Sequence, residues 1–322
     1  MVKSVFDISN SQEFNEVANR IFSHQKSNNP VYAEFSQRLE ATGNFGDLPF
    51  PFLPIEFFKS AEIKSFTVKP EETFTSSGTS GEGTSRHFVK SLSHYEKSFK
   101  IGFHRFYGTP SDYTILALLP SYLERDGSSL IYMVDKLIEQ SEKPDSGFYL
   151  NNLDALAEKL KALDAAGERV LLIGVSFALL DLIEKHRFKL NNTIIMETGG
   201  MKGRRKEVTR EELHRQLTIG FGVDSIHSEY GMTELLSQAY SKGNGRFKCP
   251  PWMKVLIREV NDPFKQASTG KTGGINVIDL ANEDSCAFIA TQDLGRLHED
   301  GSFEVLGRFD QADVRGCNLM VS

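Results

Sequence analysis

The sequence predicts an α/β protein in which a mostly parallel sheet is covered by helices on both faces, with a smaller β-rich part packed on that sheet. Between residues 113 and 216, short apolar runs alternate with longer amphipathic segments. After about residue 253 the apolar stretches become short and are separated by Gly, Asn and Asp. The 322 residues, of which 39% are hydrophobic, are enough for a sizeable core.

We therefore divide the chain into a helical entry segment (1–60), an α/β core (61–250) and a β-rich subdomain (251–322). The entry segment shows helical spacing and then the turn-forming residues Pro49, Pro51 and Pro54. Its expected helices span residues 13–22 and 32–39. In the core we expect strands at 113–119, 170–173 and 193–196, and helices at 128–140, 152–165, 177–186 and 210–216. The expected strands of the subdomain are 255–258, 274–278, 287–291 and 302–306.

Composition excludes several classes of protein. The net charge of -6 and the pI of 5.8 argue against broad attraction to nucleic acid or anionic membranes. The longest apolar run, 170–183, is interrupted by Gly174, Ser176 and Asp181, so we expect no membrane span. The first seven residues turn polar too early for a signal peptide. We expect a cytoplasmic protein.

The three cysteines are Cys249, Cys286 and Cys317. They form no CxxC pair and are odd in number, so the sequence indicates neither a zinc site nor a disulfide framework. We expect reduced thiols.

A loop rich in hydroxyls and glycines lies between an extended segment and a helix that begins near Ser91. Its residues are Ser76, Ser77, Gly78, Thr79, Ser80 and Gly81. Successive N–H groups and hydroxyls form a concavity that binds anions, and glycines allow close approach of a polyphosphate. Taken alone, the loop is equally compatible with a flexible polar surface turn. A Walker A motif is not present, because Lys265 occupies the first glycine position before Gly270-Lys271-Thr272.

Further motifs follow this loop in a fixed order. They are Tyr230-Gly231-Met232-Thr233-Glu234, Thr291-Gln292-Asp293 and Gly307-Arg308-Phe309-Asp310. The order and spacing resemble those of adenylate-forming enzymes over residues 70–317. Together with residues 119–125, 198–203 and 315–317, the chain more closely resembles the LuxE-type acyl-protein synthetases, which activate fatty acids in bacterial fatty acid reductase complexes.

This resemblance implies an adenylate-forming fold, with ATP and Mg²⁺ bound by the α/β core. The Ser76 to Gly81 loop would hold the β- and γ-phosphates. Arg86 or His87 stands near the position where the superfamily usually has a lysine, and either would act as a catalytic cation.

The resemblance assigns the remaining nucleotide contacts to the other motifs. Tyr230, followed by Gly231, would stack on adenine, and Thr233 would touch the α-phosphate. Glu234 would bind Mg²⁺ through a carboxylate, which suits a hard cation.

The resemblance implies that two further parts of the chain lie at the nucleotide. Asp293, assisted by Arg308, would accept hydrogen bonds from the ribose hydroxyls. Gly199 and Gly200 would let the backbone pass close to the nucleotide.

The resemblance also implies that Cys317 takes the acyl group and passes it to a reductase-type partner or a carrier protein. Thiolate is a strong nucleophile at neutral pH, and Arg315 favours the charged form. The chain stops five residues after Cys317. The carboxyl-terminal domain that carries the superfamily's catalytic lysine is therefore expected to be absent. Either Lys202, Arg86 or a partner would replace that lysine, or the protein would adenylate its substrate slowly.

Two other functions remain open at this stage. Gly174-Val175-Ser176-Phe177-Ala178 is close to the nucleophile elbow of α/β-hydrolases, with His214 or His227 as the nominal base. A Ser hydrolase would therefore use Ser176. The chain could alternatively be a non-catalytic module that binds an acyl group or a nucleotide.

Overall fold

The computed structural model describes residues 4–42, 46–76, 83–119, 127–149, 152–199 and 208–309. Its helices are α1 (Ser11–Asn28), α2 (Pro30–Thr42), α3 (Phe57–Ser60), α4 (Leu92–Tyr107), α6 (Ser129–Ser141), α7 (Leu153–Ala165), α8 (Ser176–Lys185) and α9 (Arg210–Phe221), with short 3-10 helices η1 (Val5–Asp7), η2 (Pro110–Asp112) and η3 (Leu280–Asn282). Its strands are β1 (Leu53–Pro54), β2 (Glu72–Thr75), β3 (Arg86–Val89), β4 (Thr114–Leu118), β5 (Gly147–Phe148), β6 (Val170–Val175), β7 (Thr193–Thr198), β8 (His227–Tyr230), β9 (Ala239–Ser241), β10 (Phe247–Lys248), β11 (Met253–Arg258), β12 (Thr272–Asp279), β13 (Phe288–Leu297) and β14 (Phe303–Arg308).

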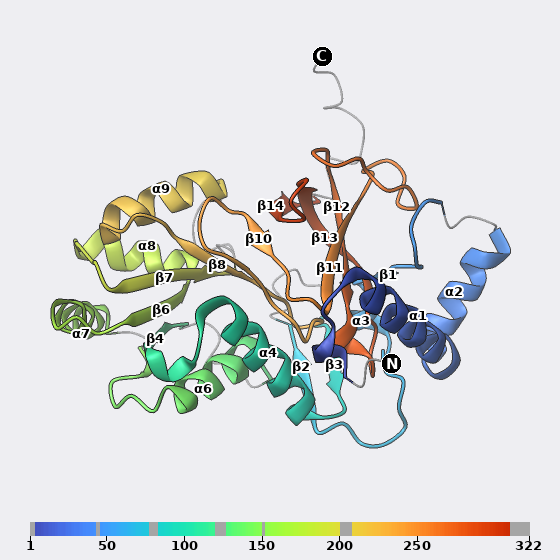
Figure 1. Ribbon diagram of the computed structural model, residues 1–322, viewed down its shortest axis with the longest axis horizontal. Helices are drawn as coiled ribbons and strands as arrows, with labels where there is room; N and C mark the ends of the chain where they lie inside the picture. The colour runs from blue at the N-terminus through green and yellow to red at the C-terminus, as the bar shows by residue number, and fades with distance from the viewer. Residues whose placement is uncertain are drawn as a thin grey trace, which may run out of the picture.

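One half of the large sheet is parallel, in the order β8-β7-β6-β4-β5. Helices α8 and α9 cover one face of this half, and α4 and α6 cover the other (Figure 1). Every residue of β4 and β6 is buried. Strands that are covered on both faces are expected to be continuous apolar runs, which is the pattern that these two segments show. The predicted α/β class is confirmed.

The other half of the sheet is largely antiparallel and consists of β9 to β14, with the short β1 pairing parallel to β13. The β-rich part was expected to pack on the sheet, but its strands belong to the sheet itself. Strand β9 pairs antiparallel with β8 and so joins the two halves, and β10 links β9 to β14. The rings of Phe247 and Phe303 stack across the pairing of β10 with β14, with centroids 5.4 Å apart. The large sheet is therefore mixed rather than mostly parallel.

The predicted helices of the entry segment are present as α1 and α2, which lie beside the antiparallel half (Figure 1). Helix α1 begins with a reciprocal cap, because Asn10 Oδ1 accepts from the Glu13 N–H at 2.9 Å and the Ser9 N–H donates to Glu13 Oε2 at 2.8 Å. At its other end, Gln25 Nε2 donates to the Asn282 carbonyl at 2.8 Å. This bond fixes the entry segment against η3.

Strands β2 and β3 form a separate antiparallel hairpin, and residues 76–85 connect them. The Ser76 N–H donates to the Ser85 carbonyl at 3.1 Å, so the two ends of the connection are hydrogen-bonded. The predicted phosphate loop therefore lies at the end of a hairpin whose base is regular.

Candidate functional site

Three residues of the predicted nucleotide site meet where the two halves of the sheet join. The Tyr230 hydroxyl, at the end of β8, donates to Asp293 Oδ2 at 2.8 Å. Arg308 Nε lies 3.4 Å from Asp293 Oδ1, because β13 and β14 pair Asp293 with Arg308 in register. The Tyr230 ring is only 7% exposed and faces Phe303 and Phe247. Adenine stacking on Tyr230 stays a prediction and would need more of the ring exposed.

The hairpin that carries the phosphate loop is bonded directly to the Tyr230–Glu234 motif. His87 Nδ1 donates to the Thr233 carbonyl at 2.8 Å, although 146 residues separate them. Burial lowers the pKa of His87 to about 4, so the ring is neutral at pH 7. A neutral ring that holds a backbone carbonyl is suited to positioning Thr233. Arg86, the other expected cation, lies over the Phe88 ring at 5.6 Å. The catalytic roles of His87 and Arg86 stay predictions.

Glu234 is the predicted magnesium ligand. Its side chain is buried, and burial raises its pKa while a hydrogen bond from Ser85 opposes the rise. Within the described ranges, no group of three or more His, Cys, Asp or Glu could hold a metal ion. Mg²⁺ in phosphate-transfer sites is commonly held by one or two carboxylates plus phosphate oxygens, so a single buried carboxylate fits this ion.

Two residues that sequence analysis missed fix the segment after Glu234 through hydrogen bonds. The buried Asp279, at the end of β12, accepts from the N–H groups of Leu236 and Ser237 at 2.9 Å each and from the Ser237 hydroxyl at 2.6 Å. Asn282 Nδ2 donates to the Glu234 carbonyl at 2.8 Å. Both bonds span more than forty residues, and the only sequence signal was a carboxylate that interrupts an apolar run at Asp279.

Replacing Asp279 by Ala should destabilise the protein by about 3 to 5 kcal/mol, because buried N–H groups of Leu236, Ser237 and Ala281 lose their acceptor. Thermal or urea unfolding measures the change. Asp284→Ala is the matched control, since Asp284 pairs with Lys90 near the surface and its loss should cost about 1 kcal/mol or less. Equal destabilisation by the two variants would contradict this role.

The end of β7 is fixed by a buried polar network. Gly199 has a φ of 69°, a left-handed conformation that favours glycine, and its carbonyl accepts from Ser176 Oγ at 2.8 Å. The buried Glu197 binds Arg210, whose charge favours the ionised carboxylate against the burial that opposes it. This network fixes the turn at Gly199, and close passage of a nucleotide there stays a prediction.

The same contacts argue against a hydrolase that uses Ser176. The Ser176 side chain is only 2% exposed, and its hydroxyl is bound to Gly199 and Glu197. Among the described residues, neither His214 nor His227 is hydrogen-bonded to Ser176. His214 Nε2 lies 3.4 Å from Glu197 and 3.2 Å from Ser228, and His227 Nδ1 lies 3.2 Å from the Tyr107 hydroxyl. A serine nucleophile needs its base within hydrogen-bond reach.

Glu229 is a second functional candidate that sequence analysis missed. Its carboxyl is buried, and Oε2 accepts from Thr198 Oγ1 at 2.5 Å. A Cβ atom on Gly231 would collide with Glu229 Oε1, so this position needs glycine. Burial, with the charge of Glu197, raises the pKa of Glu229 from 4.5 to about 7.

This pKa predicts a pH dependence of stability. Between about pH 4.5 and 7 the folded protein keeps a proton on Glu229 that the unfolded chain has released. Raising the pH through this window therefore lowers the free energy of unfolding, by about 3 kcal/mol at most from this group. Urea unfolding across the window should show this loss relative to Glu229→Gln, which cannot titrate. A constant difference between wild type and variant would contradict the assignment.

Several predicted site residues lie outside the described residues: Ser77, Gly78, Thr79, Ser80, Gly81, Gly200, Lys202, Arg315 and Cys317. Their predicted roles stay predictions. The other two cysteines are described. Cys286 is buried and Cys249 partly so, and burial raises the pKa of each to about 12.

A family model described as acyl-protein synthetase, LuxE, matches residues 129–322, which is more than half of the chain. The chain belongs to the LuxE acyl-protein synthetase family. This LuxE-family match includes the Tyr230–Glu234 motif, Asp293, Arg308 and Cys317. A search of curated proteins found no match.

Solved structures similar to this LuxE-family chain are adenylate-forming enzymes. One is the crystal structure of 2-hydroxyisobutyryl-CoA ligase in the postadenylation state with R3-HIB-AMP, at 8% identity and a TM-score of 0.69, covering 96% of this chain and 72% of that chain. Another is ATP-bound MatB from Rhodopseudomonas palustris, at 17% identity and a TM-score of 0.55, covering 73% of this chain. The match spans 47% of the MatB chain, about half its length. The predicted adenylate-forming fold is confirmed.

The family match and the similar solved structures therefore agree on the family and the fold of this chain. None of the helices in the described part of the chain is long and apolar enough to cross a membrane.

Proposed function

We propose that this protein activates a fatty or other carboxylic acid with ATP and Mg²⁺ and transfers the acyl group to the thiol of Cys317. A reductase-type partner or a carrier protein then accepts the acyl group. We place the reaction in the cytoplasm. The division into an entry segment, a nucleotide-binding core and a β-rich subdomain at residues 60 and 250 is part of the same proposal.

The observation that carries this proposal is the bonding of the loop hairpin to the Tyr230–Glu234 motif. His87 donates to the Thr233 carbonyl, and Ser85 hydrogen-bonds Glu234. The base of the hairpin that leads into the predicted phosphate loop and a carboxylate for a cation are thereby held side by side. This is the arrangement that nucleotidyl transfer needs, since catalysis of such a reaction depends on positioning and on neutralising phosphate charge.

In the first step, the substrate carboxylate attacks the α-phosphorus of ATP. An acyl–oxygen–phosphorus bond forms, the bond between the α- and β-phosphates breaks, and pyrophosphate leaves. Glu234 would hold Mg²⁺, which neutralises phosphate charge when bound. Asp293, already oriented by Tyr230 and Arg308, would accept the ribose hydroxyls.

In the second step, the thiolate attacks the acyl carbon and AMP leaves with the electron pair of the broken carbon–oxygen bond. The acceptor thiol must ionise near neutral pH. Burial makes Cys249 and Cys286 unsuited to this, because it raises the pKa of each to about 12. Cys317 is the remaining cysteine of the chain.

Exchange of labelled pyrophosphate into ATP tests the first step, and intact mass of the protein after incubation with ATP, Mg²⁺ and an acid tests the second. Acids of increasing length form the panel. We expect acid-dependent exchange and an acyl adduct on the protein. Binding of ATP without exchange would favour the non-catalytic module, and ester hydrolysis without ATP would favour the hydrolase.

A further inference from the structure

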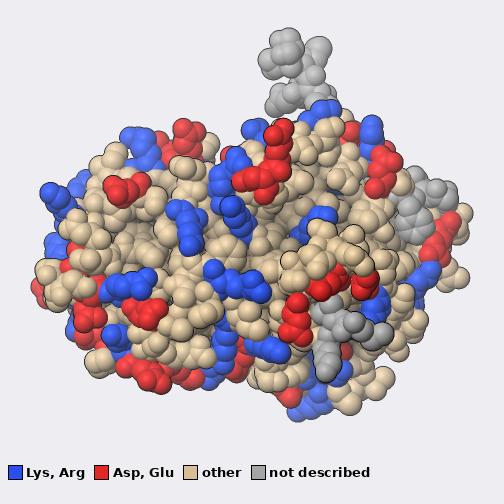
Figure 2. All heavy atoms as spheres, viewed as in Figure 1, with Lys and Arg blue, Asp and Glu red and all other residues tan. Residues whose placement is uncertain are grey.

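Arg258, at the end of β11, is a partly buried positive charge in the antiparallel half of the sheet. On the face of the molecule that Figure 2 shows, lysines and arginines are interspersed with acidic side chains, as solvated surface charges usually are. The Arg258 guanidinium instead donates to neutral oxygens of Ile275, Asn276 and Thr291, at 2.8, 2.7 and 2.6 Å. Burial lowers its pKa to about 10, which leaves it charged at pH 7. Taking a charge out of water costs free energy, so an arginine at this place indicates a specific role.

The three acceptors surround an irregular place in the pairing of β12 with β13. The regular register breaks between Gly274 and Asn276 of β12. Across this break, residues 291–293 of β13 lie opposite Ile275 alone, which makes a β-bulge. Bulges interrupt the regular bonds of a ladder and often re-aim a side chain next to an active site. This bulge contains Asp293, the predicted ribose contact.

The Arg258 guanidinium bridges the two strands at the bulge. Nη1 donates to the Ile275 carbonyl on β12 and Nη2 donates to the Thr291 carbonyl on β13, so one planar group spans the break. The guanidinium lies against Gly274, where a Cβ atom would be 2.5 Å from Cζ. On the guanidinium, Cζ also lies 5.4 Å from the centroid of the Phe309 ring. These contacts fix the guanidinium between the strands.

A short chain of hydrogen bonds leads from Arg258 to Asp293. The Ile275 carbonyl, which accepts from Arg258, also accepts from Thr291 Oγ1 at 2.9 Å. The same Thr291 oxygen accepts from the Asp293 N–H at 3.1 Å. Thr291 is therefore held through both its carbonyl and its hydroxyl, and it holds the backbone of Asp293 in turn. The position of the Asp293 carboxylate depends on this chain.

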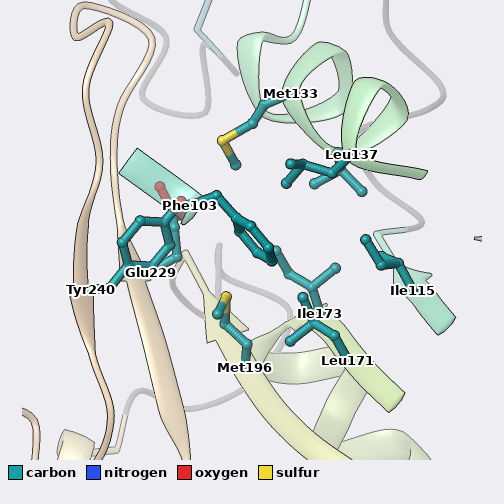
Figure 3. Close-up of a pocket in the computed structure, with 10 residues that line it drawn as sticks. Phe103, Ile115, Met133, Leu137, Leu171, Ile173, Met196, Glu229 and Tyr240 are labelled. Atoms are coloured by element: carbon teal, nitrogen blue, oxygen red, sulfur yellow. The ribbon is translucent and has the colours of Figure 1, made fainter. Parts of the chain in front are cut away.

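The parallel half of the sheet contains a cavity that is too small for a sugar. It lies between this half and the helices α4 and α6 (Figure 3). Its volume is about 10 Å³, the space of about one water molecule, and only apolar surface lines it. A ribose does not fit in this space, and the polar groups suited to recognise one lie at Asp293 in the antiparallel half.

We propose that Arg258 is a positioning residue for ATP, which holds the β13 bulge so that the Asp293 carboxylate lies where the ribose hydroxyls bind. This inference rests on the proposed function, in which Asp293 accepts those hydroxyls. Arg258 itself does not touch the nucleotide. Without Arg258 the bulge relaxes and Asp293 shifts, and a small shift of a group that orients a substrate is costly. The loss should weaken recognition of the ribose specifically.

Pyrophosphate exchange with ATP and with 2′,3′-dideoxy-ATP, which lacks both ribose hydroxyls, tests this inference. The wild type should prefer ATP by at least about 100-fold in kcat/KM, because a site built to bind a hydroxyl rejects an analogue without it. In Arg258→Met we expect kcat/KM for ATP to fall at least about tenfold and that for the dideoxy analogue to stay within about twofold of wild type. Arg258→Lys keeps a charged donor and so the fold, but it cannot bond both carbonyls in one plane, so its preference should be intermediate.

Asp293→Asn and Arg296→Met are the reference variants. Asp293→Asn should lose the preference for ATP. Arg296 also lies on β13 and donates to Thr272 Oγ1 on β12 at 3.3 Å, but it lies beyond the bulge, so Arg296→Met should keep the preference.

Three results would contradict the inference while Asp293→Asn still loses the preference: a wild-type preference in the Arg258 variants, an equal fall for both nucleotides, or a loss of preference in Arg296→Met. Each would leave the proposed function standing. A wild type without the preference, or a preference that survives in Asp293→Asn, would overturn the ribose role of Asp293 and the inference with it. No exchange with any acid would overturn the proposed function itself.

Discussion

Glu234→Gln should lose acid-dependent pyrophosphate exchange, with kcat/KM at least about 100-fold below wild type, because the amide cannot supply the negative charge that holds Mg²⁺. Gln has nearly the same shape as Glu, and the Glu234 side chain is buried at a pKa that burial raises. The fold should therefore survive the change, and its stability should be equal or higher. Exchange rates across a Mg²⁺ titration measure the effect.

The control for this variant is Glu283→Gln, which makes the same chemical change at a residue whose side chain is 38% exposed. It should leave both the rate and the Mg²⁺ dependence as in wild type. If Glu234→Gln keeps the wild-type Mg²⁺ dependence, the metal is held elsewhere and the assignment of Glu234 is wrong. A lower rate that higher Mg²⁺ partly restores would support it.

The long elements were predictable from local pattern. The runs that became β4 and β6 are apolar apart from Thr114 and Gly174, and the helices that follow them have amphipathic spacing. The link between β9 and β14 was not predictable. Strand β10 has two residues, too few to show a period, and its pairing with β9 and β14 depends on the whole chain. The β-rich part was therefore expected to pack on the sheet rather than to extend it.

The candidate site, like the fold, could be predicted only in part. Motif order identified Tyr230, Asp293 and Arg308, and the register of β13 with β14 brings them together. The side chains that hold the site were missed. Asp279 ends an apolar strand and Asn282 lies in the short helix after it, and their importance comes from hydrogen bonds to distant residues. Such properties exist only in the folded chain.

Cys317→Ser should separate the two steps of the proposed reaction. Pyrophosphate exchange should continue, because the thiol is not needed to form the adenylate. The acyl adduct that neutral hydroxylamine releases should be absent, since a serine hydroxyl is a weak nucleophile without an activating base. Intact mass before and after hydroxylamine measures both points.

Cys249→Ser is the matched control for this experiment. Burial raises the pKa of the Cys249 thiol to about 12, so only a very small fraction is thiolate near neutral pH and its loss should leave the adduct intact. An adduct that persists in Cys317→Ser but disappears in Cys249→Ser would place the acceptor at Cys249. That result would mean that the Arg315-Gly316-Cys317 sequence does not carry the acyl group. The proposed roles of Glu234 and Asp293 in adenylation would be unchanged.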